Sequence, residues 1–155
     1  NMIEEASYNS YGSLWYKWIY KYDSAGNKIE WAWYRFDGSL NYKYTYAYDS
    51  AGNMIEKAYY DSYGSYKLTY KYDSAGNRIE EAEYNSDGSL NYKYTYAYDS
   101  AGNMIEEAGY NSDGSLCWKL IYRYDSAENC IEWTVYLGKA LIPESQVVCE
   151  ITYRK

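Results

Sequence analysis

The chain contains the stretch DGSLNYKYTYAYDSAGNMIE twice, at residues 37–56 and, without a change, at residues 87–106. Looser copies of the same text fill most of the remaining sequence. Tandem copies of a short segment are typical of proteins in which supersecondary units stack on their neighbours. The repeat therefore indicates the architecture of this 155-residue chain more firmly than any single residue indicates an activity.

Two turn signals alternate along the repeats. Tyr-Asp-Ser-Ala-Gly-Asn, the YD turn, begins at Tyr22, Tyr48, Tyr72 and Tyr98, and a variant with Glu in place of Gly begins at Tyr124. Between the YD turns a Gly-Ser pair recurs, at Gly12, Gly38, Gly64, Gly88 and Gly114. Asp and Asn favour the start of a turn and Gly adopts left-handed backbone readily, so each cluster predicts a hairpin loop of about three to five residues.

The segments between the turns have the pattern of strands. Residues 40–48 alternate strictly, with leucine and four tyrosines on one face and Asn, Lys, Thr and Ala on the other. After the YD turns at Tyr22, Tyr48, Tyr72 and Tyr98 comes Ile-Glu-x-Ala-x-Tyr, first at residues 29–34. Both segments are too short for helices and are bounded by turns. Successive YD turns are 26 residues apart, except for a step of 24 from Tyr48 to Tyr72, and a deletion of two keeps each side chain on its face.

These patterns predict an all-β fold, an antiparallel meander of tandem β-hairpin repeats with about 12 strands. Because sheets twist, we expect a curled single-layer sheet or a β-hairpin solenoid, which the repeat favours over a closed barrel. The repeats occupy residues 1–137. Residues 138–155 are aliphatic and contain the chain's one proline, Pro143, so we expect them to form a capping strand segment over the open edge.

Pairing across the YD turn has two solutions. In the first, Asp49 pairs with Asn53, so that Tyr46 faces Glu56 and the tyrosines share a surface with the Glu-Ala-Tyr set. In the second, the loop is one residue longer and Tyr46 faces Ile55. The lysine and threonine of the strand then lie on the Glu-Ala-Tyr side, where Glu and Lys form a ladder over alanine. We favour the first because it gathers the positions that recur most faithfully.

The composition disfavours several classes of protein. A net charge of −7 argues against nucleic acid as a partner, and no run of roughly 20 apolar residues predicts a membrane-spanning helix. The chain has no histidine, which is the commonest general base and metal ligand. The three cysteines, Cys117, Cys130 and Cys149, form no C-x-x-C pair, and each DSAGN turn offers too few oxygens for calcium. We therefore expect no metal, no cofactor and no enzymatic activity.

A glutamate recurs at the same place in each repeat, at Glu30, Glu56, Glu80 and Glu106. Paired carboxylates can cleave glycosidic bonds. Equivalent residues in every repeat argue against a unique active site, so we interpret these glutamates as a structural ladder.

The aromatic rows are the main candidate for a binding site. The chain holds 26 tyrosines and 6 tryptophans but 1 phenylalanine, so nearly every ring carries a polar group. Such rings can stack on sugars or contact a partner surface, or they can pack on neighbouring strands, where tyrosine is common. The candidate ligand-binding residues are Trp15, Trp18, Trp31, Trp33, Tyr42, Tyr44, Tyr46, Tyr92, Tyr94 and Tyr96.

The Tyr-Asp-x-x-Gly-Asn turns, each preceded by a tyrosine two positions earlier and alternating with Asp-Gly-Ser turns, resemble the YD repeats of the RHS family over roughly residues 2–136. The resemblance implies a spiralling β-sheet, which in bacterial toxins and animal adhesion receptors builds a hollow shell or a surface scaffold. It implies no catalytic residues, since the repeats of that family carry none. This chain departs from the pattern in its tyrosine-rich strands and its small number of repeats, which are too few to enclose a cargo.

We therefore expect a non-enzymatic structural repeat segment of a larger secreted or cell-surface bacterial protein, acting as a scaffold or adhesive spacer. The chain begins inside a repeat, so we expect any targeting signal to lie outside it. One alternative is a module that binds a polysaccharide or cell-wall partner through the tyrosine and tryptophan rows. Another is self-association through the repeat ends into fibres.

Overall fold

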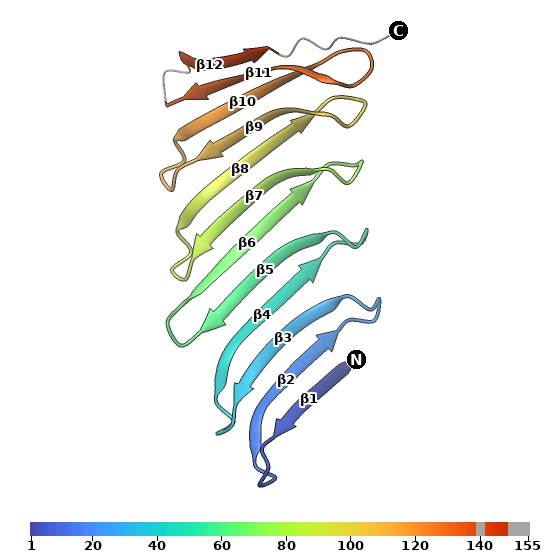
Figure 1. Ribbon diagram of the computed structural model, residues 1–155, viewed down its shortest axis with the longest axis vertical. Helices are drawn as coiled ribbons and strands as arrows, with labels where there is room; N and C mark the ends of the chain where they lie inside the picture. Colours follow the sequence, from blue (N-terminus) through green and yellow to red (C-terminus); the bar gives the residue numbers. More distant parts are fainter. Residues whose placement is uncertain (139–141, 149–155) are drawn as a thin grey trace. The chain divides into compact units, whose positions relative to one another are not determined.

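The computed structural model describes residues 1–138 and the backbone of residues 142–148. Every element in this part of the chain is a strand: β1 (Met2–Tyr8), β2 (Leu14–Tyr22), β3 (Lys28–Arg35), β4 (Leu40–Tyr48), β5 (Met54–Asp61), β6 (Ser65–Tyr72), β7 (Arg78–Asn85), β8 (Leu90–Tyr98), β9 (Met104–Tyr110), β10 (Leu116–Tyr124), β11 (Cys130–Leu137) and β12 (Ile142–Val148). The strand order follows the sequence order, and β1 and β12 end it (Figure 1). The predicted all-β antiparallel meander, a single layer that does not close, is confirmed.

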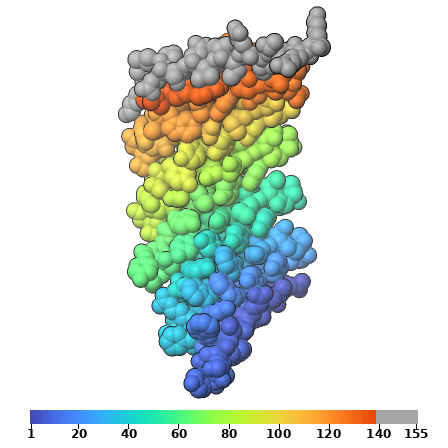
Figure 2. Space-filling view, in the orientation of Figure 1, coloured from blue at the N-terminus to red at the C-terminus, as the bar shows by residue number. Residues whose placement is uncertain are grey.

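Two compact units divide the chain. The first unit contains residues 1–70 and 83–89, and the second contains residues 71–82 and the chain from residue 90 onward. In the first unit, the side chains of successive strands form adjoining bands in sequence order, blue to green in Figure 2. Of the predicted cap, residues 142–148 form β12, which pairs with β11. Residues 139–141 and 149–155, with Cys149, lie outside the described residues. Cys117 and Cys130 are free thiols.

Each YD turn is held by its aspartate. In the turn after β4, the backbone N–H of Asp49 donates to the Asn53 carbonyl at 2.9 Å, and its carboxylate accepts bonds from the N–H groups of Ala51 and Asn53 and from the Asn53 amide. The bonds from Asn53 hold the pKa of Asp49 below its usual value. Gly52 takes a φ of 88°, where a side chain would be strained. The same bonds recur around Asp23, Asp73, Asp99 and Asp125.

A β-bulge follows each YD turn whose pairing is described, and it makes the pairing along the strands differ from the favoured register. Asp49 does bond to Asn53, but Ala47 pairs with Glu56 while Tyr48 pairs with Met54, which leaves Ile55 as the extra residue. A bulge sets two residues of one strand against one of the other, so the faces exchange beyond it. The favoured register is therefore wrong along the strand. Ile29, Ile105 and Ile131 are the equivalent extra residues.

The faces are those of the second register. Thr45 pairs with Ala58 and Lys43 with Tyr60, so lysine and threonine lie on the Glu-Ala-Tyr side. The pairing itself differs from that register, because Tyr46 faces Lys57 and not Ile55. We call this side the alanine face. Its alanines, Ala32, Ala58, Ala82 and Ala108, are the buried hydrophobic residues of the described chain, with exposed fractions of 0 to 1%.

Long polar side chains cover the alanine row. On β2, β4 and β8 a lysine lies over the tyrosine ring of the next strand, with ammonium-to-ring distances of 5.5 Å for Lys17 and Tyr34, 5.1 Å for Lys43 and Tyr60, and 4.6 Å for Lys93 and Tyr110. Each such contact contributes about 0.5–1 kcal/mol at an exposed site. Lysine stems can shield apolar atoms while their charges stay in water. A single-layer sheet thereby buries alanines without a second layer of structure.

Candidate functional site

The opposite side of the sheet is an aromatic face, built by the bulge. Beyond the bulge, the two x positions of Ile-Glu-x-Ala-x-Tyr lie opposite the tyrosines of the neighbouring strands, as Trp31 does with Tyr44 and Trp33 with Tyr42. In the first unit three of these positions are aromatic, namely Trp31, Trp33 and Tyr59. We call the resulting group the aromatic cluster: Tyr16, Trp18, Trp31, Trp33, Tyr42, Tyr44, Tyr46, Tyr59 and Tyr66.

The tryptophans of the cluster stack on one another. The Trp18 ring centre lies 5.5 Å from that of Trp31 and 5.6 Å from that of Trp33, with interplanar angles of 22° and 23°. Trp31 also stacks on Tyr44 at 5.5 Å and 13°. Aromatic pairs of this kind contribute about 0.5–1.5 kcal/mol each beyond their buried area. Stacking therefore orders the tryptophan rings into a continuous group.

Burial in the cluster affects its polar atoms. The indole Nε1 atoms of Trp31 and Trp33 are buried and have no hydrogen-bond partner within the protein. Burial raises the pKa of Tyr42. The Tyr59 hydroxyl donates a hydrogen bond of 2.8 Å to Asp61 Oδ2, and this bond raises the pKa of Tyr59 to about 12. A phenol with an ionised hydrogen-bond acceptor is thus set among half-buried rings.

The predicted site residues separate into three groups. Trp18, Trp31, Trp33, Tyr42, Tyr44 and Tyr46 come together in the aromatic cluster. Trp15 is the extra residue of the bulge between β1 and β2 and is 64% exposed, with its ring 5.8 Å from that of Tyr16. Tyr92, Tyr94 and Tyr96 lie on β8 in the second unit.

The second unit surrounds its tyrosines differently. Tyr94 pairs with Gly109, and the Trp118 ring occupies the space above that glycine, 5.8 Å from the Tyr94 ring. A Cβ atom on Gly109 would come within 2.5 Å of Trp118, so the close contact requires glycine. Tyr96 has the Arg78 guanidinium 5.3 Å from its ring.

Sequence reasoning missed Tyr16, Tyr59, Tyr66 and Trp118 as members of the aromatic face. Tyr59 occupies an x position, and the favoured register had placed x positions away from the tyrosines. The signal was present, since an x position is aromatic at Trp31, Trp33, Tyr59 and Trp133. Its meaning depended on the bulge.

The repeated glutamates form ion pairs with lysines. The nitrogen-to-oxygen distances are 2.8 Å for Lys21 and Glu30, 3.5 Å for Lys67 and Glu56, 2.8 Å for Lys71 and Glu80, and 2.7 Å for Lys119 and Glu106. A partly exposed pair of this kind contributes about 0–1 kcal/mol. Glu30 and Glu80 pair with a lysine of the preceding strand, whereas Glu56 and Glu106 pair with a lysine of the following strand.

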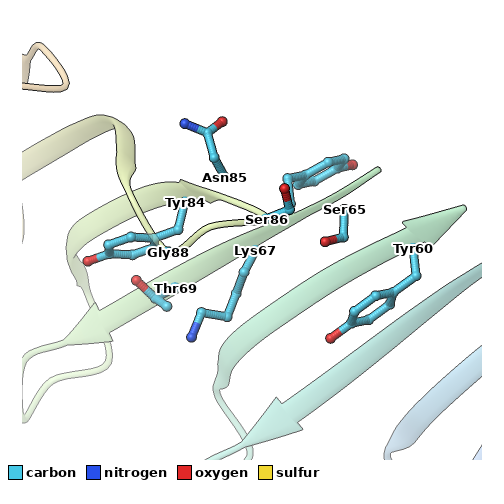
Figure 3. A pocket seen from close by; sticks show the side chains of 9 residues that line it. Tyr60, Ser65, Lys67, Thr69, Tyr84, Asn85, Ser86 and Gly88 are labelled. Carbon is cyan, nitrogen blue, oxygen red and sulfur yellow. The ribbon is translucent and has the colours of Figure 1, made fainter. Parts of the chain in front are cut away.

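The alanine face of the first unit contains an open pocket of about 470 Å³ between Tyr60 and Tyr84 (Figure 3). It lies beside the shortened Gly64 turn, where Ser65 pairs with Tyr60 at the place that Leu40 takes opposite Tyr34. The Lys67 ammonium lies 5.8 Å from the Tyr84 ring and 3.5 Å from Glu56. The pocket therefore lies at the place where the repeat is two residues shorter.

The described residues form neither a metal-ion cluster nor a membrane-spanning helix. In residues 1–138 and 142–148, no three His, Cys, Asp or Glu residues are grouped so that they could hold a metal ion. The described part of the chain also has no helix of the length and hydrophobicity needed to cross a membrane.

Known structures share this fold. The chain resembles the Photorhabdus luminescens Tc holotoxin pore, with a TM-score of 0.63 and 16% identity over 96% of this chain. Crystal structures of TcdB2-TccC3-TEV and TcdB2-TccC3-Cdc42 both give a TM-score of 0.61, with 17% and 18% identity over 92% and 95% of this chain. This chain spans 8% of the length of each. No family model and no curated protein matches the sequence. The likeness is one of fold.

Proposed function

We propose that the chain is a non-enzymatic structural repeat segment of a larger secreted or cell-surface bacterial protein, where it acts as a scaffold or adhesive spacer. One observation carries the proposal, namely that equivalent residues make the same structural contact in three of the repeats. The YD tyrosines Tyr48, Tyr98 and Tyr124 donate their hydroxyl protons to the carbonyls of Lys28, Arg78 and Met104, always 20 residues back, at 2.8 to 3.0 Å. These tyrosines join one repeat to the one before.

Two likenesses support the setting in a larger protein. The turns resemble the YD repeats of the RHS family, and the fold resembles a small part of Tc toxin chains. Neither likeness carries a catalytic group to this chain. The likeness to Tc toxin chains supports the secreted or surface location that forms part of the proposal.

A seamless deletion tests the scaffold role. Because residues 37–56 and 87–106 are identical, deleting residues 50–99 joins Asp49 to Ser100 and leaves every junction in its native sequence. A scaffold of neighbour contacts should still fold and unfold cooperatively, with an m-value that falls with the surface removed. Displayed as a stalk between a cell-surface anchor and an epitope, the shortened chain should still present the epitope. A deletion variant that is unfolded would contradict the proposal.

The aromatic cluster favours a second candidate function, binding of a polysaccharide or cell-wall surface. Nine rings gathered on the open side of a sheet form an apolar patch of the kind that marks interaction sites. Retention on insoluble glycans, with a change in tryptophan fluorescence on adding sugars, is the expected result. Trp31→Leu should abolish both responses, whereas Trp133→Leu in the second unit should preserve them. Absence of retention and an unchanged spectrum in the parent chain would exclude this function.

A further inference from the structure

The aromatic cluster contains an unbroken row of rings that runs across five strands. From Trp33 the row passes to Trp18 at 5.6 Å and to Trp31 at 5.5 Å, measured between ring centres. It continues to Tyr44 at 5.5 Å, to Tyr59 at 5.0 Å and to Tyr66 at 5.3 Å. Tryptophan and tyrosine are the aromatic side chains that lose an electron most readily. When one ring of such a row has lost an electron, a neighbouring ring at these separations readily supplies one, so that the electron vacancy moves from ring to ring.

Two of the three tryptophans in this row, Trp31 and Trp33, have no group in the protein that could accept their N–H proton. A tryptophan that has lost an electron becomes stable as a neutral radical when its N–H proton leaves. The Nε1 atoms of Trp31 and Trp33 are buried and have no hydrogen-bond partner within the protein. Buried polar groups without a hydrogen-bond partner are rare in proteins, and a redox role is one explanation for them. At these rings the vacancy stays a mobile positive charge.

Tyr59 has the proton acceptor that Trp31 and Trp33 lack. Its hydroxyl donates to Asp61 Oδ2 at 2.8 Å, and the other carboxylate oxygen of Asp61 accepts from the N–H groups of Tyr63 and Gly64 in the turn. The turn bonds hold the carboxylate in place. An ionised carboxylate in direct contact with a phenol can take its proton as the electron departs.

We infer that Tyr59 and Asp61 form a site of one-electron oxidation, supplied through the tryptophan row. An external one-electron oxidant takes an electron from a tryptophan of the cluster and is reduced. The vacancy moves along the row until Tyr59 fills it with its own electron. The Tyr59 O–H bond breaks and an O–H bond forms on Asp61. The products are a neutral tyrosyl radical, a protonated carboxyl group and the reduced oxidant.

Tyr59 is not the tyrosine that would be oxidised first if solvent exposure alone decided the site of oxidation. Tyr63 and Tyr11 are 94% and 91% exposed, and an oxidant acting by collision would attack these rings first. Tyr59 is half-buried, and its contact with Tyr44 connects it to the tryptophans. The pattern of oxidation therefore separates conduction through the cluster from direct attack.

Flash-quench oxidation of the full chain with a photoexcited ruthenium complex and persulfate tests the inference. A nitrone spin trap, followed by peptide mass spectrometry, should locate the radical at Tyr59. Tyr59→Phe should abolish the trapped product at that position, and Trp31→Leu should lower it by interrupting the row. Asp61→Asn keeps an oxygen for the turn N–H groups but supplies no base, so it should also lower the yield.

The matched control is Tyr94→Phe, which changes the residue equivalent to Tyr44 on the identical strand of the second unit and should leave the Tyr59 yield unchanged. Circular dichroism of each variant should match that of the parent chain, so that a loss of yield reports chemistry and not unfolding. A radical found mainly at Tyr11 and Tyr63 would overturn the inference. So would a Tyr59 yield that Trp31→Leu and Asp61→Asn both leave intact.

Discussion

Strands β4 and β8 have the same sequence, LNYKYTYAY, but different surroundings. On β4, Tyr44 stacks on Trp31 and lies 5.0 Å from Tyr59. On β8, the equivalent Tyr94 faces Gly109 and is covered by Trp118. The repeated residues build the same strand in both places, while the variable x positions of the neighbouring strands decide what surface that strand presents.

The largest expected effect is at the two equivalent tyrosines. Tyr44→Ala should lower the free energy of unfolding by about 3 kcal/mol, because it removes a large half-buried ring together with its contacts to Trp31 and Tyr59. Tyr94→Ala should cost about 1 kcal/mol less, since fewer ring pairs are lost. Urea denaturation of both variants measures the difference. Equal losses would show that the neighbours do not distinguish the two strands.

Gly109 allows the surface of β9 to be altered directly. Gly109→Ala should destabilise the chain by about 2 kcal/mol, because the new Cβ atom would collide with the Trp118 ring. Trp118→Leu should relieve the collision, so the double variant should be less impaired than the sum of the two single changes. Strict additivity in denaturant unfolding would contradict the close contact.

Substitutions at equivalent positions of two YD turns should change the stability in opposite directions. Gly52→Ala should cost about 1–2 kcal/mol, because Gly52 has a φ of 88°. At the equivalent position of the last YD turn, Glu128 already has a φ of 63°, so Glu128→Gly should raise the melting temperature through a gain of about 1 kcal/mol. A loss of stability on Glu128→Gly would mean that its side chain contributes more than the backbone strain costs.

The smallest expected effect is the same on both strands. Tyr48→Phe and Tyr98→Phe each remove one hydrogen bond to a carbonyl of the preceding repeat and should each cost about 1 kcal/mol. Differential scanning calorimetry should give equal shifts for the two variants. Unequal shifts would show that the contact between repeats depends on the variable positions as well.

Strands and turns could be predicted from the sequence because alternation and glycine mark them locally. The bulge at Ile55 could not, since no glycine or proline signals it and the isoleucine recurs like any strand residue. The favoured register grouped the most constant positions, yet the faces of the sheet combine constant tyrosines with variable partners. Trp31 and Trp33 were predicted as site residues because they are tryptophans near the first hairpin, while Tyr59, at an equivalent x position, was missed.

The shortened turn at Gly64 is a second feature whose consequence for the structure depends on strand pairing. The sequence showed that two residues are missing and that side chains keep their faces. The pairing in another repeat shows what the two missing residues do there. Leu40 pairs with Tyr34, and Asn41 is the extra residue of a bulge. In the shorter repeat Tyr60 pairs with Ser65 and no bulge interrupts β5 and β6. The pocket beside Tyr60 could be recognised once this pairing was known.

The bulge decides which side chains share a face, and a contact between two methyl groups tests it most directly. Residues that pair directly across strands have Cβ atoms about 4.5–5.5 Å apart. Nuclear Overhauser spectroscopy on selectively methyl-labelled protein should show a strong contact between Thr45 and Ala58, which pair in the bulged register. A contact of Ala58 with the Tyr44 ring in place of Thr45 would restore the register without a bulge and contradict the arrangement of both faces.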